Sequence, residues 1–378
     1  MASISIVANF AYGAMTDSKS GHIGGVERQT ALLAKWLSKN TAHSVSIITW
    51  NENNADDEFI DGVRIIKLCR RSDGLPGLRF VFPRWSSLVK ALSRANADIY
   101  YQNCAEYVTG QVALWCKFNN RKFVYSVASD PECDVKLPSL KTFREKLLYK
   151  AGLKNSDRII CQTKTQQLSL KNGFNLDSIV LPMPCPGPID NYTKPNHLNN
   201  GKFHVLWVGR IASVKRVELL LDIAEKADSI IFEIAGGPDQ EADYANDILE
   251  RAEKIKNVVL HGKLNRDQLN ERYAEVSAFC NTSLYEGFPN TFLEAWSFGL
   301  PVVSTINPDT LVTEHEIGIN AQTTQDFLDA FYLLQNNEKR WKTISDNARQ
   351  YYLENHALNN SMNRFLDVFE KSIDKKHD

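Results

Sequence analysis

Short runs of apolar residues alternate with amphipathic helical patterns along the whole chain. The runs are bounded by turn residues and are too short to be buried helices, so they predict strands. Strands that are apolar throughout, separated by helices, are typical of parallel sheets covered by helices on both faces. The predicted strands of the first half are Ile4–Phe10, Val45–Trp50, Val63–Leu68, Asp98–Tyr101, Phe123–Val127, Arg158–Gln162 and Ile179–Met183. Those of the second half are His204–Val208, Ile230–Ala235, Val258–Leu260, Ala278–Asn281 and Pro301–Ser304.

The two sets of strands are separated by a proline-rich segment. Four prolines fall within seven positions, 182–188, and a polar stretch follows to Lys202. Such a segment is stiff and extended and cannot continue a helix. The length of 378 residues is also large for one core. We therefore expect an α/β protein with two doubly wound, Rossmann-like domains, residues 1–185 and 202–355, joined by a linker at 186–201.

Composition excludes several classes of protein. The net charge of −1 provides no basic field, which argues against a nucleic acid as the main partner. Seven scattered cysteines without a C-x-x-C pair suit reduced thiols in a cytoplasm. The start of the chain runs directly into a strand without the pattern of a signal peptide, and there is no apolar run of about 18 residues that would span a membrane. We expect a cytoplasmic protein.

The most informative segment contains two glutamates. Glu286 and Glu294 have seven residues between them, and Gly287, Phe288 and Pro289 form a turn that opens a helix at Asn290. The first carboxylate should therefore lie on a loop and the second in the first turns of the helix, facing one crevice. The free amides of a helix N-terminus favour a phosphate group. Two acids for hydroxyls beside a helix start for phosphate suit a sugar carried on a diphosphate.

Two further strand ends carry candidate phosphate contacts. Arg210 and Lys215 follow the strand His204–Val208, and an arginine can hold a phosphate with two hydrogen bonds. A solvated basic turn is the alternative. Gly24 and Gly25 follow the first strand and enter a helix, Val26–Leu37, where the lack of a side chain would let a ligand approach the backbone. A simple turn is the alternative, and the pair does not form a dinucleotide-binding fingerprint.

Acidic residues at other strand ends suggest acceptor contacts. Asp130 lies at the tip of the strand Phe123–Val127, where it could contact an acceptor hydroxyl or cap a helix, and Glu106 after the preceding strand could line the same cleft. His22 is the one histidine in a candidate ligand loop. The chain has no D-x-D, H-E-x-x-H or Cys/His cluster, so no metal site is expected. Phosphate-loop and nucleophile-elbow motifs are also missing.

Together, the acid pair in its Gly-Phe-Pro-Asn-Thr context, Gly209-Arg210 with Lys215, and Gly24-Gly25 resemble glycosyltransferase family 4. The resemblance implies the GT-B fold, two Rossmann-like domains facing a deep interdomain cleft, with a final helix, 356–378, packing back on the first domain. It implies a retaining, nucleotide-sugar-dependent enzyme. By the resemblance, Arg210 and Lys215 bind the donor diphosphate, Glu294 the nucleotide ribose, and Glu286 with the backbone of 287–290 the donor sugar. The resemblance places Gly24 and Gly25 near the diphosphate.

Two departures from the family pattern matter. Many relatives have a histidine after the strand Phe123–Val127, where this chain has Ala128-Ser129-Asp130, so a catalytic role for Asp130 is a hypothesis. Arg216 stands where a glycine is common, and would either add a third phosphate cation or cover the helix.

The expected activity is metal-independent transfer of a sugar from a UDP-, GDP- or ADP-sugar, with no other cofactor, to a glycan or lipid-linked acceptor in surface polysaccharide or glycoconjugate synthesis. A donor-binding, non-catalytic partner subunit and a GT-B-shaped nucleotide-sugar epimerase are the alternatives. A second hypothesis concerns the segment Ser72–Trp85, which is rich in arginines and aromatic residues. These side chains could rest on the anionic inner face of the cell membrane, and a solvated loop is the alternative.

Overall fold

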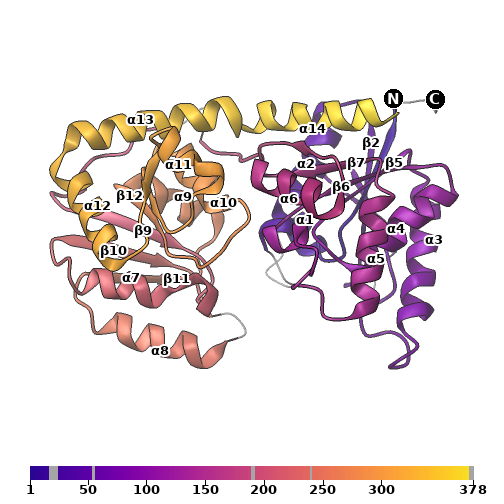
Figure 1. Ribbon diagram of the computed structural model, residues 1–378, viewed down its shortest axis with the longest axis horizontal. Coiled ribbons are helices and arrows are strands. Elements are labelled where there is room, and N and C mark those ends of the chain that lie inside the picture. Colours follow the sequence, from indigo (N-terminus) through magenta and orange to yellow (C-terminus); the bar gives the residue numbers. More distant parts are fainter. Residues whose placement is uncertain (17–23, 53–55, 189–191, 239–240, 374–378) are drawn as a thin grey trace. The chain divides into compact units, whose positions relative to one another are not determined.

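The computed structural model describes residues 1–16, 24–52, 56–188, 192–238 and 241–373. The chain divides into two compact units, Met1–Pro182 with Ser361–Asp378, and Met183–Asn360. Each unit contains one twisted sheet with helices packed against it (Figure 1). The predicted α/β class with two parallel sheets is confirmed.

The sheet of the first unit has its strands in the order β3-β4-β2-β1-β5-β6-β7-β8. All neighbours are parallel except the pair β3 and β4. The strands are β1 Ser3–Val7, β2 Ser44–Thr49, β3 Glu58–Ile60, β4 Val63–Lys67, β5 Ile99–Asn103, β6 Lys122–Ser126, β7 Arg158–Cys161 and β8 Ile179–Val180. From β1 the chain builds outward on one side to β2 and β4, and then returns to place β5 on the other side of β1. This reversal creates a topological switch point between β1 and β5.

Helical segments connect these strands, and the longer helices bury an apolar stripe against them. They are α1 Tyr12–Thr16, α2 Gly25–Asn40, η1 Phe80–Trp85, α3 Ser86–Ala95, α4 Tyr107–Phe118, η2 Asp130–Cys133, α5 Phe143–Lys154 and α6 Lys164–Phe174. From Ser361 onward the last helix, α14 Leu358–Ile373, also belongs to this unit. Its buried Phe369 ring meets the Tyr101 ring edge-on, with the centroids 5.5 Å apart.

The sheet of the second unit is parallel throughout, in the order β11-β10-β9-β12-β13-β14. Its strands are β9 Phe203–Val208, β10 Ile230–Ala235, β11 Val258–Gly262, β12 Ala278–Asn281, β13 Val302–Ser304 and β14 Gly318–Asn320. The helices are η3 Ser213–Lys215, α7 Val217–Ala224, α8 Ala242–Glu253, α9 Arg266–Glu275, α10 Asn290–Ser297, η4 Pro308–Thr310, α11 Leu311–Glu314, α12 Thr324–Asn336 and α13 Glu338–Asn355. The chain reverses between β9 and β12, which is where ligands bind in open α/β sheets.

Each strand predicted from an apolar run is present, with ends shifted by a few residues. The strands β3 and β14 were missed because both are three-residue edge strands with little apolar burial. Phe59 of β3, for example, is 74% exposed.

The first part of the proline-rich segment is hydrogen-bonded to the second unit. The Cys185 backbone pairs with the backbone after α13, and its carbonyl accepts a hydrogen bond from the Tyr352 hydroxyl at 2.9 Å. The same hydroxyl accepts the Gly187 amide at 2.9 Å. These bonds place residues 183–188 on the surface of the second unit, so the units divide after Pro182, whereas the sequence placed the boundary after residue 185.

Candidate donor and acceptor sites

The turn after β9 lies against the turn after β10, and glycines make this possible. A Cβ atom at Gly236 would lie 1.8 Å from the carbonyl oxygen of Gly209, so no other residue fits there. The Ile211 amide also donates to the Gly237 carbonyl at 2.9 Å. The backbone from Gly209 onward is therefore held at the carboxyl edge of the sheet, beside the switch point.

At the switch point, the structure brings Lys215 and Glu286 together. The ammonium of Lys215 forms an ion pair with the Glu286 carboxylate, and the two side chains are only 21% and 17% exposed. The Ser283 hydroxyl donates to the same carboxylate oxygen at 2.7 Å. The Thr282 hydroxyl donates to the Lys215 carbonyl at 2.7 Å, which locks η3 onto the loop after β12. Two residues 71 positions apart thus form one charged cluster.

The other two basic residues of the turn differ from Lys215. Arg210 is exposed at the end of β9. Arg216 adopts a left-handed backbone conformation, with φ of 49°, at the start of α7. Glycine adopts this conformation without strain, whereas a residue with a side chain such as arginine rarely does.

Glu294 lies in the second turn of α10 and is held by residues of α9. Its Oε1 accepts a hydrogen bond from Arg266 Nη1 at 2.5 Å, and its Oε2 accepts one from the buried Tyr273 hydroxyl at 3.0 Å. Each carboxylate oxygen can accept a second hydrogen bond, so Glu294 remains able to bind hydroxyl groups in a fixed orientation. Sequence reasoning missed Arg266 and Tyr273, because nothing local relates them to the acid pair.

The residues between the two glutamates form the predicted turn and helix start. Pro289 occupies the N-cap position of α10 with an extended backbone, and Asn290 is the first helical residue. Phe288 is 8% exposed and packs edge-on against Trp296, with centroids 6.1 Å apart. This contact anchors the loop that carries Glu286 and Gly287. The first amides of α10 therefore have a fixed direction.

In the first unit, Gly24 and Gly25 lie at the start of α2. The Gly24 amide donates to the Glu27 carboxylate at 2.9 Å, which satisfies one backbone donor at the helix start. The glycine pair therefore has a clear structural role as a helix entry. The candidate His22 lies outside the described residues.

Asp130 is exposed at the start of η2, and its Oδ1 accepts a hydrogen bond from Gln166 Nε2 at 2.9 Å. The neighbouring Glu132 is buried and receives the Tyr125 hydroxyl at 2.6 Å and the Ala128 amide at 3.1 Å. The loop after β6 is thus built around a buried carboxylate. Burial raises the pKa of Glu132, against the effect of these hydrogen bonds.

Neither a metal-binding cluster nor a membrane-spanning helix is present among the described residues. Across the described residues, no group of three or more His, Cys, Asp or Glu side chains is arranged to hold a metal ion. Within the same ranges, no helix combines the length and apolarity needed to cross a bilayer. The expectation of a metal-free reaction remains a prediction.

Comparison with known proteins identifies the class. Residues 23–182 match the family model described as Glycosyltransferase Family 4, and residues 202–337 match that described as Glycosyl transferases group 1. The chain also superimposes on sucrose-phosphate synthase from Thermosynechococcus elongatus with a TM-score of 0.78, over 98% of this chain and 99% of that chain, at 17% identity. The chain belongs to the family 4 glycosyltransferases and has the GT-B fold, as the resemblance implied.

Individual relatives share low sequence identity with the chain. Anabaena HepE, solved in complex with UDP-glucose, has a TM-score of 0.76 over 98% of this chain and 100% of that chain, at 14% identity. A poly(ribitol-phosphate) alpha-N-acetylglucosaminyltransferase of Staphylococcus aureus is 25% identical over 224 residues, which are 56% of this chain and 43% of that protein. The chain spans less than half the length of the first curated relatives it matches.

Proposed function

We propose that the protein is a retaining glycosyltransferase that uses a UDP-, GDP- or ADP-sugar, with the donor bound at the switch point of the second unit. The observation that carries this proposal is the Lys215–Glu286 ion pair, which lies beside the start of α10. Lys215 and Arg210 would bind the diphosphate, and Glu294, held by Arg266, would bind the ribose hydroxyls. Glu286 and the amides of residues 287–290 would hold the donor sugar.

The reaction follows from these charges. Cleavage of the bond between the anomeric carbon and the phosphate oxygen develops negative charge on the leaving diphosphate. Fixed donors aimed at such a charge each contribute roughly 3–4 kcal/mol to transition-state stabilisation. We propose that the acceptor oxygen attacks the same face of the sugar and that the leaving phosphate oxygen takes the acceptor proton. The cations of the turn would take the place that a metal ion has in other transferases.

The test has three measurements on the purified full chain. A thermal-shift panel of UDP, GDP, ADP and their sugars should identify one nucleotide that raises the melting temperature. Transfer from the matching donor should persist in excess EDTA, and NMR of the product should show the donor's anomeric configuration. Inversion would refute the retaining mechanism, and loss of activity in EDTA would refute metal independence. Formation of an altered sugar without any acceptor would instead favour an epimerase.

The acceptor class is also a proposal. The Staphylococcus aureus relative is named for transfer to a poly(ribitol-phosphate), and an Escherichia coli relative is named as an O-antigen chain mannosyltransferase. We propose a glycan or lipid-linked acceptor in the synthesis of a surface polysaccharide or glycoconjugate. A role for Asp130 in binding this acceptor remains part of the proposal, since its carboxylate is exposed at the strand end.

We propose further that the first unit rests on an anionic membrane. Leu75, Leu78 and Phe82 are 70%, 66% and 68% exposed in the segment predicted for this role. The guanidinium of Arg144 lies 3.8 Å from the centroid of the Phe80 ring and so joins this segment to α5. A face of α5 adds exposed apolar and basic side chains, namely Phe143, Leu147, Lys150 and Lys154.

Flotation with phosphatidylglycerol vesicles tests the membrane proposal. Binding is expected at low salt. It should be lost at about 0.5 M salt, because salt at this concentration screens charges beyond a few ångströms. Leu78→Glu should weaken it, and Phe118→Glu, a substitution at an exposed phenylalanine on α4, serves as the control. Failure to float with anionic vesicles at any salt concentration would rule the proposal out.

A further inference from the structure

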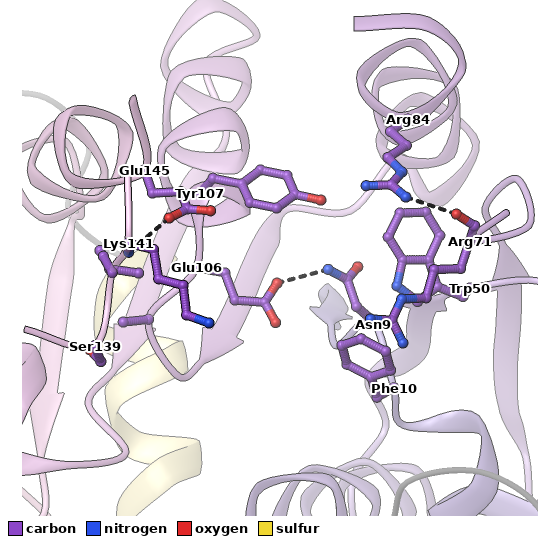
Figure 2. Close-up of a pocket in the computed structure, with 12 residues that line it drawn as sticks. Asn9, Phe10, Trp50, Arg71, Arg84, Glu106, Tyr107, Ser139, Lys141 and Glu145 are labelled. Atoms are coloured by element: carbon purple, nitrogen blue, oxygen red, sulfur yellow. Dashed lines mark hydrogen bonds between the residues drawn. The ribbon is translucent and has the colours of Figure 1, made fainter. Parts of the chain in front are cut away.

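A cavity of about 330 Å³ lies at the carboxyl edge of the sheet in the first unit (Figure 2). Its walls come from segments that follow four parallel strands. Asn9 and Phe10 follow β1, Trp50 follows β2, Arg71 follows β4, and Glu106 follows β5. The strands β1 and β5 are the pair at which the chain reverses direction across the sheet. The cavity thus occupies the position where open parallel sheets bind ligands.

The floor of the cavity is polar and incompletely paired. Asn9 Nδ2 donates to Glu106 Oε2 at 2.8 Å, across the switch point. Asn9 is 7% exposed, yet its Oδ1 has no hydrogen-bond partner among the described residues. Arg84 Nε, also buried, has none within the same ranges. A buried polar atom without a partner costs about 1–3 kcal/mol, so one acceptor and one donor at this cavity point to a ligand that pairs with both.

The charges of the lining favour an anion. Arg71, Arg84 and Lys141 bring three cations to the cavity. The Glu145 carboxylate is used locally, because it accepts the amides of Lys141 at 3.0 Å and Thr142 at 2.9 Å. Burial raises the pKa of Glu106 to about 7, so this carboxyl is partly neutral near neutral pH. Positive charge therefore exceeds negative charge in the cavity.

Aromatic rings complete the lining. Trp50 is 5% exposed, and the Arg84 guanidinium carbon lies 5.9 Å from the centroid of its ring. The Arg71 guanidinium carbon lies 5.3 Å from the centroid of the Phe10 ring. Figure 2 shows the Tyr107 hydroxyl pointing toward the Arg84 guanidinium. Apolar ring faces beside a few fixed polar groups are typical of sites for small polar ligands, and one sugar ring with a charged substituent matches the volume.

We infer that this cavity binds the acceptor sugar and that this sugar carries an anionic group, a phosphate or a carboxylate. Arg71 and Arg84 hold the anionic group, since a guanidinium matches both geometries. Asn9 Oδ1 accepts a hydroxyl hydrogen of the sugar, and Glu106 supports the Asn9 amide. The acceptor role rests on the proposed function, whereas binding of an anionic sugar can be tested without any transfer reaction.

Calorimetric titration of the full chain tests the inference with glucose 6-phosphate, glucuronate and glucose as probes. The charged sugars are expected to bind at least about 10-fold more tightly than glucose, as loss of one charged contact implies. The preferred probe tells phosphate from carboxylate. Arg84→Met should remove this preference, and Arg71→Met should reduce it. Arg158→Met, at the amino end of β7 and thus at the opposite edge of the sheet, should leave it unchanged.

Titrations in a second variant distinguish binding at this cavity from binding at the proposed donor site. Because the turn at Lys215 could also hold a phosphate, the titrations are repeated in Lys215→Met, where the affinity for the charged sugars should be retained. Equal affinity for glucose and the charged sugars, or unchanged affinity in both arginine variants, would overturn the inference. Nucleoside diphosphate binding decides the proposed function separately: if the wild-type chain binds no nucleoside diphosphate, that proposal fails whatever the cavity binds.

Discussion

The ion pair between Lys215 and Glu286 allows the donor assignment to be tested residue by residue. Lys215→Met removes the charge but keeps most of the aliphatic stem, and Glu286→Gln removes the charge but keeps the shape. In the structure, Glu286 would retain the Ser283 hydroxyl at 2.7 Å after loss of the lysine. Each substitution therefore removes one charge from a cluster that is otherwise intact.

The magnitudes follow from the burial of the pair, whose side chains are 21% and 17% exposed. Exposed pairs contribute about 0.2–1 kcal/mol, and breaking a fully buried pair costs about 3–5 kcal/mol. We expect each single variant to lower the free energy of unfolding by about 1–2 kcal/mol, and the double variant by less than their sum. Loss of a charged contact to phosphate should weaken nucleoside diphosphate binding by roughly 10- to 100-fold in Lys215→Met.

Glu286→Gln should have the opposite signature. It removes the anion that competes with phosphate for Lys215, so nucleoside diphosphate affinity should stay the same or rise. Turnover of the intact nucleotide sugar should fall by roughly 100-fold, because the contact to the donor sugar is lost. Calorimetric titration, urea denaturation and initial rates measure the three quantities.

The matched control is Lys254→Met, since Lys254 forms a pair with Glu250 in which both side chains are more than 70% exposed. It should change stability by less than about 0.5 kcal/mol and leave donor binding unchanged. Wild-type affinity for nucleoside diphosphate in a folded Lys215→Met protein would refute the assignment. So would an equal loss of that affinity in Glu286→Gln, because the two residues would then not have separate roles.

Three further predictions concern supporting residues. Arg266→Ala leaves Glu294 with one remaining partner. It should lower the free energy of unfolding by about 1–3 kcal/mol and weaken nucleoside binding in the calorimetric titration. Unchanged nucleoside affinity would contradict the proposed ribose role of Glu294. The pKa of Glu106 rises from 4.5 to about 7 on folding, mainly through burial, so the native state binds more protons and stability falls as the pH rises through this window. Between about pH 4 and pH 8, the free energy of unfolding of the wild type should fall by about 3 kcal/mol relative to that of Glu106→Gln, as measured by urea denaturation. Parallel dependences of the unfolding free energy on pH in the two proteins would contradict this prediction. Gly236→Ala should destabilise by more than about 2 kcal/mol because its Cβ would overlap a backbone oxygen, whereas Gly262→Ala, with φ of 64° and open space, should cost about 1 kcal/mol by thermal melting.

The elements that the sequence predicted correctly share one physical property. The strands of parallel sheets are buried on both faces, so they appear as short, mainly apolar runs, as in residues 205–208 of β9. The turn and helix around Glu286 and Glu294 are equally local, since Gly287, Pro289 and Asn290 determine them within a few residues. The three-residue edge strands β3 and β14 lack this signal and were missed.

The partners of the site residues are not local. Glu106 meets Asn9 from 97 positions away, and Glu294 meets Arg266 from 28 positions away. Both contacts depend on strand order, and an apolar run does not specify which strands become neighbours. The sequence by itself therefore determined the elements and identified Glu286, Glu294 and Lys215 as candidate site residues. Only the tertiary structure decided which of these side chains pair and where a polar cavity forms, because the carboxyl ends of the strands come together only once the sheets have assembled.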